Sequence, residues 1–460
     1  MDGGRLCERN HKALRLYHTN EADGVRLSAT RLGLVCCVGC GTCAGICPES
    51  AIEMLLNSAG STYFARQKKG KCTDCGLCAK VCPFAFARSD ESESGPADVR
   101  HLLMGDFDNC YVGHSMDEMI RFNSSSGGLV TSLLIFALER GIIDGAVVTM
   151  MENEDPFNPK PFVARTRNEI LQASGSKYCP VPLNVALKEV LESDEKVALV
   201  GLPCHIRGAR LAGAVNRTIR DRVVIHLGLF CSHTPSFIGT KFLCRKIGIE
   251  RSEVSRIEYR TNGWPGGMEI VKRSGEKLRV PNQSTMSRLA FGSLLFSPFG
   301  CLFCADATAE LADLSFGDPW LEDVLRTERI GKSIVIERTA VGKRILADAS
   351  ACGVIDLSNI DSKRVIESQK ATLHFKKMNL TARMRVGRHV CSDSLDGASI
   401  EGSSWFNNVL AIPSVVLCNL CNREFAQDFL LRAPMSIILL YESAYSHLYS
   451  KLVHRDLEVL

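Results

Sequence analysis

The chain has 460 residues, of which 21 are cysteine and 45% are hydrophobic, and its formal net charge is +4. Charge so close to balance gives no reason to expect a nucleic acid or a charged membrane surface as the partner. The N-terminus has no apolar stretch behind basic residues, as a signal peptide has, and no apolar run reaches the roughly 18–20 residues that span a bilayer. We therefore expect a cytoplasmic protein whose reduced cysteines bind metal rather than form disulfides.

The composition changes along the chain and divides it into five segments. A polar extension precedes a cysteine-rich segment, and a stretch rich in charge, serine, glycine and proline then predicts a linker. Alternating strand and helix patterns follow, and these weaken into a mostly helical tail. The predicted boundaries are 1–30 for the extension, 31–90 for the cysteine-rich segment, 91–114 for the linker, 115–385 for the core and 386–460 for the tail.

One cysteine spacing occurs twice in the cysteine-rich segment. Each copy is C-x2-C-x2-C-x3-C-P, the spacing of bacterial ferredoxins that hold two [4Fe–4S] clusters. Three thiolates close in sequence wrap one cubane, and the fourth ligates the other cluster. The first predicted cluster therefore uses Cys37, Cys40, Cys43 and Cys82, and the second uses Cys72, Cys75, Cys78 and Cys47. Two zinc sites are the alternative, which the uninterrupted runs disfavour because zinc usually takes separate C-x2-C pairs.

Residues 115–385 alternate apolar strands with helices. This pattern predicts an α/β fold, an α+β core with a mixed sheet, preceded by a small ferredoxin-like domain with two [4Fe–4S] clusters. Gly127–Arg140 has apolar residues at helical spacing, and Gly141 follows it as a C-cap. Five apolar runs predict strands: Ile142–Met150, Lys196–Val200, Arg222–Phe230, Leu311–Phe316 and Ser333–Thr339.

A second set of cysteines is scattered through the core, either after predicted strands or in a C-x2-C pair. It comprises Cys204, Cys231, Cys301 and Cys304. Ligands of open α/β sheets gather beyond the carboxyl ends of the strands, so we expect the first two thiols at one crevice that the C-x2-C loop closes. Four thiolates suit a third [4Fe–4S] cluster, and a zinc site or unliganded buried thiols are the alternatives.

Six motifs in this region occur in an order that resembles a known family. They are Ser124–Thr131, Gly175–Tyr178, Gly201–Cys204, Cys301-x2-Cys304-x-Asp306, Ala312–Trp320, and Gly331–Ser333 before Arg338-Thr339. Together they resemble the β subunit of coenzyme F420-reducing hydrogenase and dehydrogenase. The plant 7-hydroxymethyl chlorophyll a reductase and the N-terminal half of a deazaflavin-dependent sulfite reductase look similar. The resemblance covers about residues 31–345.

The resemblance implies FAD, a cluster on the scattered cysteines, and a reductase or dehydrogenase reaction. Serines that cap a helix near Gly127, together with the adjacent glycines and the helix dipole, suit the diphosphate of FAD. Lys177 would add a positive charge, and Tyr178 would pack on a ring. The predicted FAD contacts are Ser124, Ser125, Ser126, Gly127, Gly128, Lys177, Tyr178 and Pro203.

The predicted function is that of an iron–sulfur flavoprotein oxidoreductase. It would pass electrons between a hydride carrier such as coenzyme F420, FAD and [4Fe–4S] clusters, and no residue is assigned an acid or base role. The alternative is an electron-transfer subunit of a larger redox complex, with no substrate of its own. The expected partner is a redox protein or a small hydride carrier, and the sequence leaves both a monomer and an oligomer open.

Overall fold

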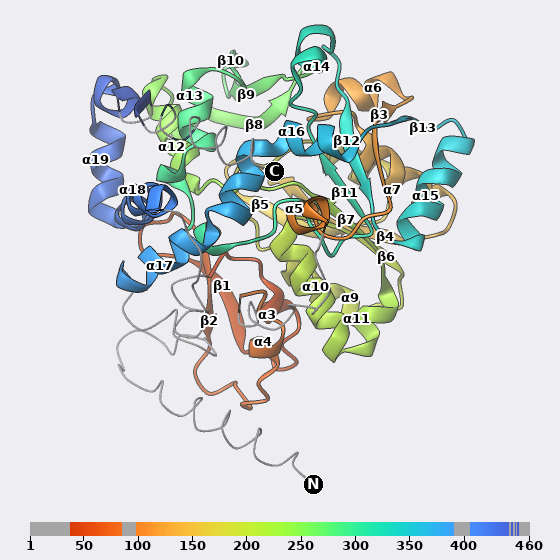
Figure 1. The fold of residues 1–460 in the computed structure, drawn as a ribbon. Helices are drawn as coiled ribbons and strands as arrows, with labels where there is room; N and C mark the ends of the chain where they lie inside the picture. The colour runs from red at the N-terminus through yellow and green to blue at the C-terminus, as the bar shows by residue number, and fades with distance from the viewer. Residues whose placement is uncertain are drawn as a thin grey trace.

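The computed structural model describes residues 37–84, 98–390 and 405–440, together with residues 443, 444, 447 and 449. The predicted extension 1–30 and the stretch Ser89–Pro96 lie outside the described residues. A small N-terminal module lies below a larger α/β core, and helices from the C-terminal part of the chain pack along one side of that core (Figure 1). Among the described helices, none combines the length and apolar character that crossing a membrane requires.

The N-terminal module, residues 37–84, consists of a hairpin and two single-turn helices. Its elements are α3 (Thr42–Gly45), β1 (Ile52–Leu56), β2 (Tyr63–Gln67) and α4 (Leu77–Lys80). β1 and β2 pair antiparallel, with Met54 opposite Ala65. Ile46 and Val81 of the module belong to the same hydrophobic cluster as buried residues of the core. The module is therefore packed into the core.

An eight-stranded mixed sheet forms the centre of the core. In spatial order its strands are β13 (Ile355–Asn359), β3 (Asn109–Ser115), β12 (Ser333–Glu337), β11 (Leu314–Gly317), β7 (Val223–Leu229), β6 (Val197–Gly201), β4 (Gly145–Met151) and β5 (Pro159–Ala164). The four strands β11, β7, β6 and β4 run parallel, and the outer strands are antiparallel. The parallel strands consequently direct their carboxyl ends to one edge, where ligands of such sheets bind.

Helices cover both faces of this sheet, because alternate residues of each strand are buried on opposite sides. On β6, for example, Ala198 packs into one hydrophobic cluster and Leu199 into another. The first cluster includes α7 (Leu129–Glu139) and α15 (Ala340–Ala351). The second includes α9 (Leu187–Glu192), α10 (Pro203–Val215) and α11 (Arg217–Arg222). A third contains residues of α5 (Val99–Met104) and α16 (Ser362–Leu373) against β12.

A smaller sheet and the C-terminal helices complete the core (Figure 1). The sheet has the order β10 (Lys277–Pro281), β9 (Gly267–Lys272) and β8 (Val254–Thr261). Its neighbours include α12 (Phe237–Lys246) and α13 (Thr285–Ser287). The remaining helices are α6 (Glu118–Asn123), α8 (Arg167–Gln172), α14 (Glu322–Thr327), α17 (Leu380–Val390), α18 (Trp405–Cys421) and α19 (Glu424–Arg432).

The predicted fold class is confirmed. Two of the predicted segments contribute more secondary structure to the core than their sequences suggest. The expected linker 91–114 contains α5 and most of β3, and β3 pairs with both β12 and β13 inside the large sheet. The expected tail 386–460 contains α18, which packs against α17 and against the loop segment Phe299–Phe303. The helix α18 agrees with the predicted helical character of the tail, whereas its packing and the pairing of β3 depend on segments far away in the sequence.

Candidate redox site

Two groups of four thiols lie in the N-terminal module. The first thiol group comprises Cys37, Cys40, Cys43 and Cys82. Within it, Cys43 lies close enough to the other three to interact with each electrostatically, and burial raises its pKa. The second thiol group comprises Cys47, Cys72, Cys75 and Cys78. Here Cys78 interacts with the other three, and burial raises its pKa to about 11. The fold thus brings the fourth cysteine of each run to the other run's triplet.

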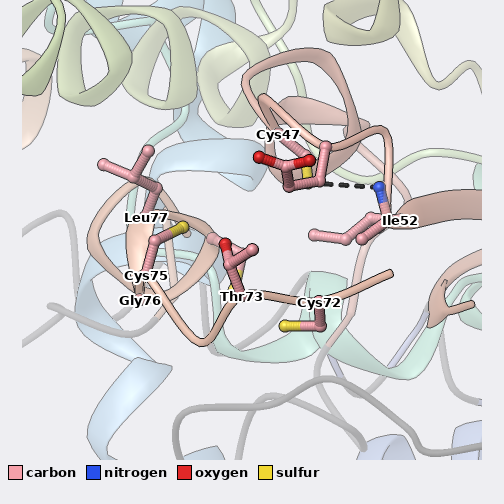
Figure 2. A pocket seen from close by; sticks show the side chains of 10 residues that line it. Cys47, Ile52, Cys72, Thr73, Cys75, Gly76 and Leu77 are labelled. Carbon is pink, nitrogen blue, oxygen red and sulfur yellow. Dashed lines mark hydrogen bonds between the residues drawn. The ribbon is translucent and has the colours of Figure 1, made fainter. Parts of the chain in front are cut away.

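The second thiol group lines a cavity that opens beside α4. Figure 2 shows Cys47 on one side of this cavity and Cys72 and Cys75 on the other. The lining residues are Cys47, Glu49, Ala51, Ile52, Cys72, Thr73, Cys75, Gly76, Leu77 and Cys78. Cys75 is exposed, whereas Cys40 of the first group is buried. The second group therefore lies at the surface of the module and the first lies further inside.

Backbone and side-chain donors approach the sulfur atoms of the module. The N–H of Ala51 donates to Cys47 Sγ at 3.3 Å, and the N–H of Asp74 donates to Cys72 Sγ at 3.4 Å. Cys40 Sγ lies 3.3 Å from Thr42 Oγ1. Hydrogen bonds to ligating sulfur favour the thiolate and tune the reduction potential of a bound cluster. These contacts suit iron–sulfur ligands.

A third thiol group lies at the edge of the large sheet. It comprises Cys204, Cys231, Cys301 and Cys304. Cys204 is the second residue of α10, directly after β6, and Cys231 lies two residues beyond the end of β7. The C-x2-C pair belongs to the single-turn segment Phe299–Phe303 and the residue after it. Cys204 interacts electrostatically with the other three thiols. The structure thus brings the scattered cysteines together.

A zinc ion holds four ligand atoms about 2.0–2.3 Å away. Within residues 37–84, 98–390 and 405–440, no three Cys, His, Asp or Glu side chains have a geometry that would hold one ion. In a cubane each thiolate binds a different iron, so its four ligands stand further apart. Each thiol group supplies the four thiols that one cubane binds.

The three thiol groups form a continuous series. Cys204 of the third group interacts electrostatically with Cys40 of the first group. Cys43 of the first group interacts with Cys78 of the second. The first group therefore lies between the sheet edge and the module surface. Neither cysteine spacing nor strand prediction could reveal this order, because it depends on how the module docks.

Asn184 joins the module to the core between the first and third thiol groups. Its N–H donates to Cys40 O at 3.0 Å, and its Nδ2 donates to Thr42 Oγ1 and to His205 O, each at 2.8 Å. The module and the core lie very close together here. A Cβ on Gly45 would lie 2.0 Å from Asn184 O, and a Cβ on Gly208 would lie 2.2 Å from Thr42 Oγ1. Glycine is required at both positions. No sequence motif marks Asn184, which sequence reasoning missed.

Replacing Asn184 with alanine is expected to loosen the docking of the module by about 1–3 kcal/mol, because two buried hydrogen bonds are lost. If the first and third thiol groups hold the predicted clusters, the magnetic coupling between these clusters, measured by electron paramagnetic resonance of the reduced protein, should weaken. Asn216→Ala is the matched control, since it removes only the N-cap of α11 and costs about 1 kcal/mol without touching the module. Unchanged coupling in Asn184→Ala would show that other contacts fix the module.

The predicted FAD loop Ser124–Gly128 is held by bonds within the protein. Ser125 Oγ accepts the N–H of Ser176 at 2.7 Å, and Ser126 Oγ donates to Lys332 O at 2.5 Å. The expected serine cap is wrong: α7 has Gly128 as its N-cap, with φ 77°, and no side chain caps it. The first N–H groups of α7 therefore have no capping side chain, which leaves a helix N-terminus of the kind that binds anions.

The other predicted FAD contacts have structural partners of their own. Lys177 Nζ donates to Ala173 O at 2.5 Å and to Ser174 O and Gly175 O, each at 2.9 Å. These three bonds use all three ammonium hydrogens, and burial lowers the pKa of Lys177 to about 8. Tyr178 packs against Tyr259 and Phe291, and Pro203 is the first residue of α10. Their contact with FAD stays a prediction.

A buried ion pair that sequence reasoning missed lies beyond the end of β11. The guanidinium of Arg260 donates to both carboxylate oxygens of Asp318, at 2.5 and 2.8 Å. Trp264 Nε1 donates to the same carboxylate at 2.8 Å, and the ring of Trp264 stacks on Trp320 with centroids 5.3 Å apart. Ser125 Oγ donates to Arg260 O at 3.3 Å. This network links the predicted FAD loop to the carboxyl edge of the sheet.

Three family models match the chain. The model for a 4Fe–4S dicluster domain matches residues 36–111. The model described as coenzyme F420 hydrogenase/dehydrogenase, beta subunit N-term, matches residues 110–188. The model for the C terminus of the same beta subunit matches residues 194–363. The last two together take in more than half of the chain.

Several known proteins are similar to this chain. The β subunit of coenzyme F420 hydrogenase from Methanothermobacter thermautotrophicus is 29% identical over 297 residues, covering 62% of this chain and 98% of the relative. The corresponding subunit from Methanosarcina barkeri is 29% identical over 274 residues, covering 57% and 86%. A chain of the F420-reducing [NiFe] hydrogenase complex from Methanosarcina barkeri, solved as a xenon derivative, matches with a TM-score of 0.48 and 27% identity, covering 62% of this chain and 94% of that chain. On the family models, the chain belongs to the coenzyme F420 hydrogenase/dehydrogenase β-subunit family and carries a 4Fe–4S dicluster domain ahead of the family core.

Proposed function

We propose that this iron–sulfur protein transfers electrons between a small hydride carrier at the edge of the large sheet and a redox partner at the surface of the N-terminal module. The observation that supports this most strongly is the series of three thiol groups, linked by the proximity of Cys204 to Cys40 and of Cys43 to Cys78. Each group has the four thiols that one [4Fe–4S] cluster needs.

The partner would bind at the second thiol group. Cys75 is exposed, and Thr73, Asp74 and Lys80 beside it are exposed as well. A cluster there would lie near the protein surface, whereas the first thiol group is covered by the core. Short distance to the surface favours exchange of electrons with another protein, so this face of the module is the proposed exit.

The hydride carrier would bind beyond the carboxyl ends of β6, β7 and β11, where the third thiol group lies. Similar proteins are named for coenzyme F420, and we propose a deazaflavin of this class as the carrier. FAD would convert a two-electron hydride into single electrons for the clusters. The uncapped N-terminus of α7 and the loop Ser124–Gly128 support its diphosphate site.

A second candidate function is electron transfer within a larger complex, without a substrate of the chain's own. The similar proteins are named as β subunits, so each is one part of an assembly. Anaerobic turnover of the isolated chain with reduced deazaflavin and a viologen dye separates the two functions. Reduction of the dye supports the first function. Intact cofactors without turnover support the second.

Metal and flavin analysis of anaerobically purified protein tests the shared basis of both functions. We expect about twelve irons per chain, four for each of three cubanes, and one FAD. The iron should be accompanied by acid-labile sulfide in equal amount. Zinc in place of iron would contradict the proposal, and iron without flavin would leave only the electron-transfer role.

A further inference from the structure

Lys376 is a buried lysine that faces the third thiol group. It lies in the π-helical turn His374–Met378 between α16 and α17, and its relative exposure is 1%. This position is outside the residues 194–363 that the family model matches. A turn of π-helix inside a helical segment is often found at functional sites.

The neighbours of Lys376 are thiols. Its side chain lies close enough to Cys304, Cys231 and Cys301 to interact with each of them electrostatically. Lysine is ordinarily charged at neutral pH, so an ammonium lies beside the proposed cluster ligands.

Lys376 has no carboxylate to balance its charge within the described part of the chain. The adjacent Lys377 pairs with Glu310 at 2.5 Å, whereas no ion pair of Lys376 with an Asp or Glu is formed there. A buried charge without a counter-charge is strongly unfavourable. The four thiolates of the third thiol group, carrying a cluster, would supply the missing negative charge.

The segment that carries Lys376 is fixed to the cysteine loop. Arg383, fully buried in α17, donates from Nε to Leu302 O at 2.7 Å, and Leu302 lies between Cys301 and Cys304. Phe375 belongs to the same hydrophobic cluster as Leu302 and Phe303. The backbone on both sides of Lys376 is thus tied to the loop, so the position of the ammonium relative to the thiols is set by packing.

We propose that Lys376 is a fixed positive charge against a [4Fe–4S] cluster on the third thiol group and raises the reduction potential of that cluster. A cluster with four thiolates is negative, and accepting one electron makes it more negative by one charge. A neighbouring ammonium stabilises the reduced form more than the oxidised form, because cluster potential follows local charge and hydrogen bonding. This inference rests on the proposed function, since it assumes that the third thiol group holds a cluster.

An anaerobic redox titration followed by electron paramagnetic resonance tests the proposal on the full-length protein. Cys231→Ser first identifies the signal of the third cluster by its loss. In Lys376→Met, we expect at least a tenfold fall in the equilibrium constant for reduction of this cluster, which is about 59 mV for one electron. The other two clusters should keep their potentials. Lys376→Arg, which keeps the charge, should stay near wild type.

Lys370→Met is the matched control, because it removes an exposed lysine from the neighbouring helix α16. An equal shift in Lys370→Met and Lys376→Met, or no shift in either, would overturn the proposal. If the Lys376→Met protein folds but loses the third cluster, the Lys376→Arg protein provides the test. Retention of the third cluster in Lys376→Arg supports a role for the charge, and loss of the cluster in this variant rejects that role. Wild-type protein with about eight irons and no third signal would instead refute the proposed function itself.

Discussion

A Cys204→Ser protein is expected to lose the cluster proposed for the third thiol group and, with it, the proposed electron transfer from the sheet edge to the N-terminal module. Cys204 belongs to the third thiol group and is also the member that interacts with Cys40 of the first group. Its loss removes a ligand at the point where the two groups meet. Iron content should fall by about four atoms per chain, and dye reduction by reduced deazaflavin should fall to background.

The N-terminal clusters should survive this substitution, because their ligands come only from the module. Electron paramagnetic resonance after chemical reduction should still show two interacting clusters. Cys352→Ser is the control, since Cys352 is an exposed cysteine outside all three thiol groups. Full dye reduction by the Cys204→Ser protein would mean that electrons leave the sheet edge without passing the third thiol group.

Replacement of Arg260 with methionine is expected to destabilise the protein by about 3–5 kcal/mol, because it leaves a largely buried carboxylate without its partner. Arg260 is 3% exposed, and its guanidinium makes two bonds to Asp318. The carboxylate would keep one strong donor, Trp264 Nε1. Anaerobic thermal unfolding of the loaded protein should show a clear fall in the transition midpoint.

An exposed arginine on the same strand provides the comparison. Arg256 of β8 is 56% exposed and pairs with Glu258 at 3.5 Å and with the buried Glu269 at 3.7 Å. Without Arg256, Glu269 keeps Lys277 and Arg279 as partners. Exposed ion pairs contribute only about 0–1 kcal/mol, so Arg256→Met should leave the midpoint almost unchanged. The double replacement Arg260→Met with Asp318→Leu should recover part of the loss, because no unpaired charge is left behind. Equal effects of Arg256→Met and Arg260→Met would contradict the argument.

Local sequence patterns were sufficient to predict the family, the fold class and the positions of several strands along the chain. The runs Lys196–Val200 and Arg222–Phe230 correspond to β6 and β7, which are apolar because both faces are covered. The dicluster motif is equally local, since its ligands lie within short, fixed spacings. Such features depend on neighbours in sequence and need no knowledge of the packing.

The parts that sequence could not predict depend on contacts between distant segments. The role proposed for Lys376 depends on its proximity to Cys231 and Cys304, which lie far from it in the chain. Nothing in the sequence around Asn184 indicates that its side chain bonds to both the module and the core. The serine cap predicted for α7 failed because Ser126 bonds to Lys332 O instead, on a loop far along the sequence.

The close packing of the N-terminal module against the core at Asn184 also limits which other ferredoxin domains could replace the module. Ile46 and Val81 complete a hydrophobic cluster that otherwise belongs to the core, and Gly45 admits no side chain against Asn184. A core truncated before residue 98 would expose this apolar surface and tend to aggregate. A foreign ferredoxin would need matching small residues along its contact helix. The docking surface is therefore expected to be specific for this module.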